Sequence, residues 1–138
     1  MEYINCLQKV SNPALKELLQ EERLSEEGIK QMVMQFLDHV KKGIWKEEGW
    51  SKVWTDYSVS KLALNAHSRI LAKQHKGNNL SVNCFYPGFT KMAMTRGQDV
   101  RTAEEAAEVG ARLALLPPGE LPTEKFFKWS RPILYSKL

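Results

Sequence analysis

The 138-residue sequence lacks several features that mark special classes of protein. It has only two cysteines, Cys6 and Cys84, which are too few for a disulfide framework and favour a reducing, cytoplasmic setting. None of its apolar runs approaches the length of about 20 residues that a transmembrane helix needs. The first residues have neither the basic flank nor the apolar core of a signal peptide. We therefore expect a cytoplasmic protein that has no membrane partner.

The sequence also lacks any run of Lys or Arg, although its charge is unevenly distributed. Residues 1–50 carry a net charge of −2 and residues 51–138 one of +6. A basic second part is compatible with nucleic acid, an anionic lipid surface or a phosphorylated small molecule. Because no aromatic platform for stacking bases accompanies the charge, we expect no nucleic-acid partner. A small basic module for nucleic acid or anionic lipid is the weaker alternative, and a phosphate-bearing cofactor stays open.

Helix signals fill the first part of the sequence. Asn12 before Pro13 predicts a capped short helix that runs to about residue 22. Ser25 predicts the start of a second helix, which ends at Gly43. Six apolar residues recur along it at helical spacing: Ile29, Met32, Val33, Phe36, Leu37 and Val40. Residues 44–54 predict a loop anchored by tryptophans, and a third helix follows from there to residues 76–77.

The second part of the sequence alternates strand and helix. Strands are predicted over 80–86 and 125–129, and the tail after residue 130 is expected to be irregular. Between the strands, the capping box that starts at Thr102 predicts a helix to about residue 116. Two strands that flank a helix are expected to be parallel, which predicts an α/β fold.

The third predicted helix needs more packing partners than the two predicted strands supply. Its apolar residues lie on two sides, with Val59, Leu62, Ala63, Ala66 and Ile70 on one and Leu64 and Leu71 almost opposite. Such a helix needs cover on both sides, and two strands are not a stable sheet by themselves. We therefore expect the chain to be the C-terminal part of something larger.

Tyr57-Ser58-Val59-Ser60-Lys61 is the pattern that points most directly to chemistry. Residues four apart in a helix lie on one face, about one turn apart, so Tyr57 and Lys61 are expected to be neighbours. A phenol ordinarily has a pKa of about 10, and a nearby ammonium favours the phenolate. Such a pair can exchange protons near neutral pH, as carbonyl–alcohol interconversion requires. The same spacing also occurs by chance in helices whose tyrosine packs and whose lysine is solvated.

Pro87-Gly88-Phe89-Thr90 follows the first predicted strand, at the end where open parallel sheets bind ligands. A Pro-Gly turn at this point lets a cofactor approach the backbone closely, although it also serves as an ordinary strand terminator. The order of helix, strand and turn predicts a cofactor site at this turn.

These features resemble the C-terminal half of a short-chain dehydrogenase/reductase, of the monomeric carbonyl reductase branch with its plant menthone, neomenthol and salutaridine reductase-like enzymes. Four runs carry the resemblance: Tyr57–Lys73, Ser81–Thr90, Ala106–Pro118 and Lys125–Ser130. It implies the C-terminal part of a Rossmann-type doubly wound parallel sheet, with residues 1–138 as one partial domain. Residues 11–54 are then a helical insertion over a dimerisation face, which implies a monomer, and residues 55–130 hold the catalytic helix, the last two core strands and the helix between them.

The resemblance also implies roles for individual residues. Tyr57 would be the general acid/base of a ketone or aldehyde reduction with NADP(H), and Lys61 would bind the nicotinamide ribose and favour the Tyr57 phenolate. The main chain at Pro87–Thr90 would face the nicotinamide amide. Phe89, Met92 and Met94 are candidate apolar contacts for a small-molecule carbonyl substrate of terpenoid or alkaloid size, under a lid formed by residues 91–100. No metal is implied.

Several features of that family are absent from these residues. There is no TGxxxGxG turn, no Asn-Asn-Ala-Gly segment and no serine to polarise the substrate carbonyl. Met92 stands where the family has a threonine that contacts the nicotinamide amide. The N-terminal nucleotide-binding half is therefore expected to be missing, which predicts a truncated and inactive chain. The alternative is a non-enzymatic remnant, or interaction fragment, that associates with a partner through an uncovered sheet edge.

Overall fold

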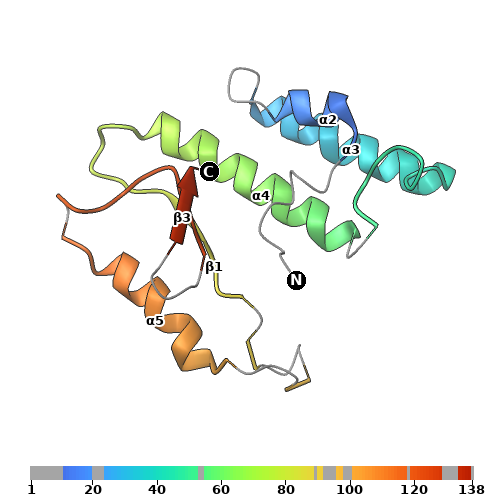
Figure 1. The fold of residues 1–138 in the computed structure, drawn as a ribbon. Helices are drawn as coiled ribbons and strands as arrows, with labels where there is room; N and C mark the ends of the chain where they lie inside the picture. The colour runs from blue at the N-terminus through green and yellow to red at the C-terminus, as the bar shows by residue number, and fades with distance from the viewer. Residues whose placement is uncertain are drawn as a thin grey trace. The chain divides into compact units, whose positions relative to one another are not determined.

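A computed structural model of the chain describes residues 11–19, 24–52, 55–88, 90–91, 96–97, 101–117, 119–128 and 134–137. The chain divides into two units, residues 1–71 and 72–138. In chain order the elements are α2 (Pro13–Leu18), α3 (Glu26–Lys42), α4 (Thr55–Gln74), β1 (Asn83–Tyr86), α5 (Ala103–Ala114), β2 (Lys125–Lys128) and β3 (Leu134–Lys137). Figure 1 shows these elements along the chain.

The helices of the first unit begin at the predicted caps. The Asn12 side chain accepts a hydrogen bond of 2.9 Å from the Ala14 amide, and the Ser25 hydroxyl accepts one of 3.0 Å from the Gly28 amide. Gly43 ends α3 in the left-handed conformation, with φ of 73°, which a residue without a Cβ adopts without strain. The first helix is shorter than predicted, because α2 ends at Leu18.

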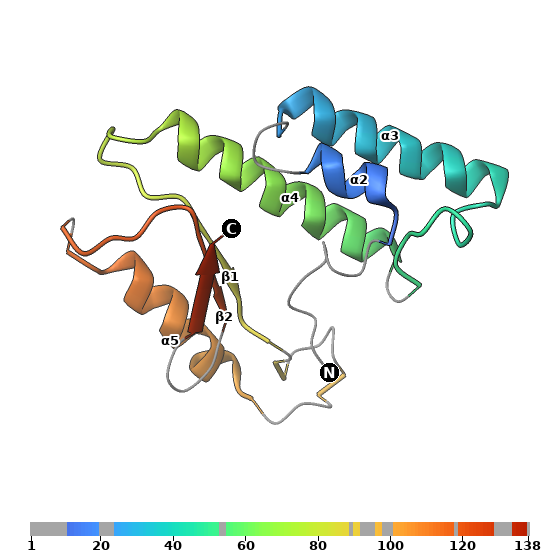
Figure 2. The ribbon, with the colours of Figure 1, turned by 45° about the horizontal axis from the view of Figure 1, so that its top comes forward.

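The core of the first unit lies where α2, α3 and the first part of α4 meet the tryptophan loop. Figure 2 shows α2 running alongside α3. The buried residues of this core are Leu15, Leu19, Met32, Phe36, Trp50, Val59, Leu62 and Ala66. Two of the apolar residues that recur along α3 lie outside this core, because Leu37 is 50% exposed and Val40 45% exposed. Leu37 lies away from the side of α3 that carries Met32 and Phe36, whereas Val40, four residues after Phe36, lies at the edge of that side in the last turn of the helix.

Trp50 anchors the loop to α3. Its indole is 2% exposed and meets the Phe36 ring edge-on, with centroids 5.0 Å apart. The indole N–H donates a hydrogen bond of 3.1 Å to Nδ1 of His39. The loop is also tied to the start of α2, because the Ser11 amide donates to the Gly49 carbonyl at 2.9 Å. The buried Trp50 side chain and these two hydrogen bonds thus hold the loop in place, although it is neither a helix nor a strand.

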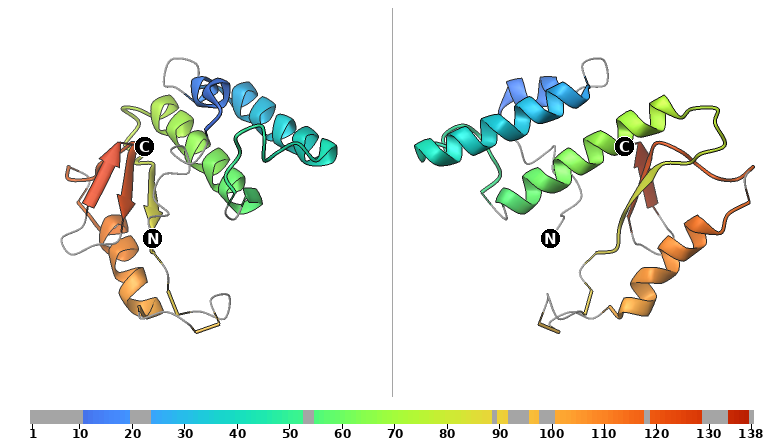
Figure 3. Two further views of the ribbon diagram at one scale, coloured as in Figure 1. Left: turned by 45° about the vertical axis from the view of Figure 1, so that its right-hand side comes forward. Right: turned by 180° about the vertical axis from the view of Figure 1, so that it is seen from behind.

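The second unit is a three-stranded sheet with α5 on one face (Figure 3). The strand order is β1-β2-β3, with β1 and β2 parallel, as predicted, and β2 and β3 antiparallel. The ring of Phe85 in β1 packs against α5 at Gly110, where a Cβ would make an ordinary van der Waals contact with the ring at 3.7 Å. The prediction of an irregular tail was wrong, because residues 134–137 form β3. No helix within the described ranges is long and apolar enough to cross a bilayer.

Side chains fix the parallel register at the start of β1 and β2. The Lys125 amide donates to Oδ1 of Asn83 at 3.1 Å, and the Val82 amide donates to the Thr123 hydroxyl at 3.2 Å. Between these contacts, the Glu124 amide donates to the Val82 carbonyl at 2.9 Å. A shift of either strand by one residue would break all three bonds.

Candidate functional site

Tyr57 and Lys61 are neighbours on the first turns of α4. The Lys61 ammonium nitrogen lies 5.4 Å from the centre of the Tyr57 ring, within the range of a cation–π contact. The structure thus brings together the two side chains that the sequence predicted to share a helix face. Their role in catalysis stays a prediction.

The packing of α4 leaves this pair accessible. Val59, Leu62 and Ala66 are buried in the core of the first unit, which confirms one of the two apolar sides predicted for this helix. Tyr57, in contrast, is 49% exposed, and Lys61 is also exposed. The core therefore fixes the helix by one side while the phenol and the amine remain available to a ligand.

The first turn of α4 is held by hydroxyl groups. The Thr55 hydroxyl donates to the Ser51 carbonyl at 2.7 Å, which ties the start of the helix to the end of the loop. The Ser60 hydroxyl donates to the Tyr57 carbonyl at 2.8 Å. These bonds use backbone carbonyls, so they restrain the backbone of Tyr57 without engaging its phenol.

A turn follows β1 at the predicted Pro87-Gly88. Gly88 has a φ of 77°, a conformation that residues with a side chain rarely adopt. Thr90 is 2% exposed, and its hydroxyl donates to the Gly88 carbonyl at 3.3 Å. The predicted site residues Phe89, Met92 and Met94 lie outside the described residues, as does most of the predicted lid.

Arg101 contacts this turn, which sequence reasoning missed. Its Nη1 donates to the Pro87 carbonyl at 2.5 Å, and a Cβ built on Gly88 would come within 2.0 Å of the same nitrogen. The guanidinium therefore occupies the space beside Gly88 in which the sequence predicted the close approach of a cofactor. The only signal in the sequence is a basic residue directly before the capping box at Thr102, and this pattern does not predict a contact with a residue 14 positions away.

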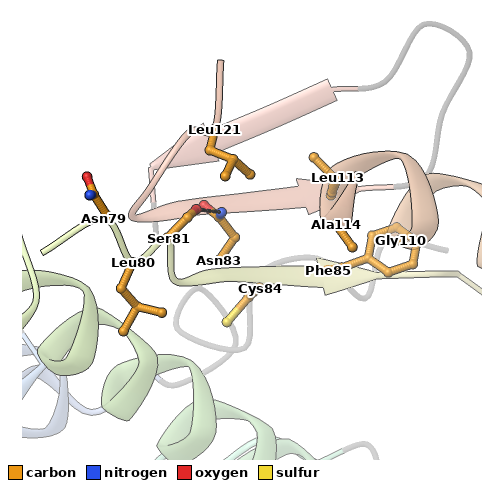
Figure 4. Close-up of a pocket in the computed structure, with 10 residues that line it drawn as sticks. All are labelled: Asn79, Leu80, Ser81, Asn83, Cys84, Phe85, Gly110, Leu113, Ala114 and Leu121. Atoms are coloured by element: carbon orange, nitrogen blue, oxygen red, sulfur yellow. Dashed lines mark hydrogen bonds between the residues drawn. The ribbon is translucent and has the colours of Figure 1, made fainter. Parts of the chain in front are cut away.

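The second unit also has an open cavity of about 450 Å³, shown in Figure 4. It lies between β1 and α5, and Cys84, Phe85, Gly110 and Leu113 are among the residues that line it. Of the predicted site residues that the structure describes, none lines this cavity. Within the described ranges, no cluster of His, Cys, Asp or Glu could hold a metal ion.

The known proteins to which we compare the chain here are dehydrogenases and reductases. The chain is 42% identical to (+)-neomenthol dehydrogenase of Arabidopsis thaliana over 122 residues, which cover 88% of this chain and 40% of that protein. It is 32% identical to human carbonyl reductase [NADPH] 1, over 80% of this chain and 40% of that protein. The solved structure of salutaridine reductase from Papaver somniferum has a TM-score of 0.78 and 36% identity, and the match covers 87% of this chain and 40% of that one.

No family model matches the chain. The chain spans about 40% of the length of the relatives named above. Over that part it is homologous to plant neomenthol and salutaridine reductases and to carbonyl reductases, and the predicted resemblance is confirmed. Its α/β architecture, with a parallel strand pair, matches that of a solved reductase.

Proposed function

We propose that this chain, as a homologue of the short-chain reductases, carries the proton-transfer part of an NADP(H)-dependent enzyme that reduces a ketone or aldehyde to an alcohol. The observation that supports it most is the Lys61 ammonium 5.4 Å from the centre of the exposed Tyr57 ring. The names of the relatives support the reaction class, because they include a carbonyl reductase [NADPH] and plant reductases. The substrate class, a terpenoid- or alkaloid-like carbonyl compound, is part of the proposal.

In the proposed reaction, the Tyr57 hydroxyl donates its proton to the carbonyl oxygen of the substrate. NADPH, when held by Lys61 and the turn after β1, would supply the hydride, and with the proton from Tyr57 the product would be an alcohol. The Lys61 ammonium favours the phenolate that Tyr57 becomes, because a positive charge close to the ring stabilises the developing negative charge. In the reverse direction, the same phenolate accepts the proton of the alcohol.

The proposed contacts to the cofactor come from the side chains of α4 and from the turn after β1. Lys61 is exposed and has donors that suit the two ribose hydroxyls of the nicotinamide half. The main chain at Pro87, Gly88, Phe89 and Thr90 is proposed to face the nicotinamide amide. Phe89, Met92 and Met94 are proposed as apolar contacts for the substrate.

We further propose that the 138 residues alone do not hold NADP(H). Dinucleotide sites of this kind use a glycine-rich turn at a helix N-terminus to bind the phosphates, and this sequence contains no such motif. The exposed pair on α4 supplies proton transfer but cannot supply the hydride. Titration of the chain with NADPH, followed by fluorescence, is expected to show no saturation up to millimolar concentration.

A monomer is also part of the proposal. Helices α2 and α3 and the tryptophan loop cover the Val59–Leu62–Ala66 side of α4, so this side of the helix is not available to a second copy. Sedimentation velocity over a range of concentrations is expected to give one species of monomer mass. A concentration-dependent dimer would overturn this part of the proposal.

The proposed reaction is tested in a protein to which a cofactor site has been added. Residues 1–138 are joined to the part of Papaver salutaridine reductase that lies outside the structural match, which gives what we call the joined protein. The joined protein is expected to oxidise NADPH in the presence of ketones. A well-folded joined protein that binds NADPH but reduces no ketone or aldehyde would contradict the proposed function.

A further inference from the structure

Arg101 forms hydrogen bonds with the turn after β1 through both its side chain and its backbone. Its Nη1 donates to the Pro87 carbonyl at 2.5 Å. Its own carbonyl accepts a hydrogen bond of 2.8 Å from the Lys91 amide. The two contacts lie at the two ends of the segment 87–91, so one residue fixes both ends of the turn.

The contact between Arg101 and the turn requires a glycine at position 88. A Cβ on Gly88 would lie 2.0 Å from Nη1 and 3.1 Å from Cζ of Arg101. Only a residue without a side chain lets the guanidinium lie this close to the backbone, and the φ of 77° favours glycine as well. The positive φ and the close approach are therefore two separate reasons for glycine at position 88.

The backbone of Arg101 is held in place by the start of α5, so that its side chain can hold the turn. Arg101 directly precedes Thr102, which caps α5 through a capping box with Glu105. The Thr102 hydroxyl accepts from the Glu105 amide at 3.2 Å, and the Glu105 carboxylate accepts from the Thr102 amide at 3.0 Å. An arginine side chain adds a planar set of donors, which holds a carbonyl with more directional precision than a lysine does.

We propose that Arg101 is a positioning residue for the cofactor: through its contacts with Pro87 and Lys91 it holds the backbone at Gly88 in the conformation that receives the nicotinamide amide. This role rests on the proposed function, because that function assigns the turn to the nicotinamide. Arg101 acts through the turn and touches no reacting atom. Its loss therefore weakens NADPH binding more than it slows the chemical step.

The first test uses the 138-residue chain itself and needs no activity. In Arg101→Ala, hydrogen exchange measured by NMR is expected to be about tenfold faster at the Lys91 amide, since a charge-assisted hydrogen bond to the turn is lost. The signals of Gly88 and Thr90 are expected to move. Arg101→Lys restores part of the protection. Arg112→Ala is the matched control, because Arg112 lies on α5, whose start Arg101 precedes, and pairs with Glu108. An Arg101→Ala chain whose Lys91 amide and Gly88 signal match the wild type would overturn the proposal.

A double-mutant cycle tests the close approach separately. Gly88→Ala is expected to raise the unfolding equilibrium constant of the second unit in both backgrounds, by a factor that is at least about fivefold smaller in Arg101→Ala than in the wild type. Equal factors in the two backgrounds would show that only the φ of Gly88 matters, which overturns the contact as the reason for glycine. If Arg101→Ala fails to fold, as judged by circular dichroism, the cycle is measured with Arg101→Lys.

The joined protein then separates the positioning role from a purely structural one. Arg101→Ala is expected to raise the KM for NADPH about tenfold while kcat changes less than threefold. An unchanged KM together with faster Lys91 exchange would mean that the contact is structural only, and would overturn the proposal. A joined protein that never uses NADPH, with normal Lys91 protection, would overturn the proposed function and the cofactor role with it, so the two failures are distinguishable.

Discussion

The ammonium of Lys61 stands 5.4 Å from the centre of the Tyr57 ring, one turn further along α4. The contact needs no other element, because residues four apart in a helix meet on the same side. The core contacts of Val59 and Leu62 turn this side of α4 away from the interior of the first unit. Packing and helix geometry together thus keep a phenol beside a cation and leave both accessible.

The first prediction concerns Lys61. In the joined protein, Lys61→Met is expected to raise the KM for NADPH at least about tenfold, because one charge-assisted hydrogen bond is worth about 1.5–3 kcal/mol. A fall in kcat is expected as well, since the methionine no longer favours the phenolate of Tyr57. Steady-state kinetics with NADPH as the varied substrate measures both effects. Lys73→Met, near the end of the same helix, is the control and is expected to leave both constants within twofold.

A second prediction concerns the bond between Trp50 and His39. Trp50→Phe removes the indole N–H and leaves Nδ1 of the buried His39 without this donor. Together with the lost packing volume, this is expected to lower the free energy of unfolding of the first unit by about 2–4 kcal/mol. Urea unfolding followed by circular dichroism measures the change. Trp45→Phe, which alters a less buried indole of the same loop, is expected to cost less than half as much.

The third prediction concerns an exposed ion pair on α3. A hydrogen bond of 2.7 Å from the Lys42 ammonium holds the pKa of Asp38 below its usual value of 3.8. Because the folded-state pKa is lowered, the pair contributes stability above the unfolded pKa and loses it as the pH falls through the folded one. In Lys42→Met, the pKa of Asp38 is expected to rise, as an NMR titration of its side-chain carboxyl can show. An unchanged Asp38 pKa would mean that the pair is open in solution.

Much of the fold could be predicted because its signals are local. The Asn12 and Ser25 caps, the Gly43 helix end and the Thr102 capping box each depend on residues within four positions of one another, and all were found where expected. The Tyr57–Lys61 contact is local in the same sense. Side chains that meet through one turn of helix can be placed from their spacing alone.

What could not be predicted depends on contacts between distant residues. β3 exists because Leu134–Lys137 pairs with β2, and a segment of four residues has too little pattern to show this by itself. Leu37 shares the helical spacing of the buried Met32 and Phe36 but is exposed, because the spacing of apolar residues does not tell which part of a wide apolar face is covered. The contact of Arg101 with Pro87 joins residues 14 positions apart through a guanidinium that could have pointed elsewhere.

The most direct test of the central claim compares two hydroxyl deletions in the joined protein. Tyr57→Phe removes the proposed proton donor, and Ser60→Ala removes the hydroxyl that donates to the Tyr57 carbonyl. If Tyr57 donates the proton, kcat for ketone reduction falls at least about 100-fold in Tyr57→Phe and changes less than threefold in Ser60→Ala. A Tyr57→Phe variant that reduces the ketone as fast as the wild type would contradict the account.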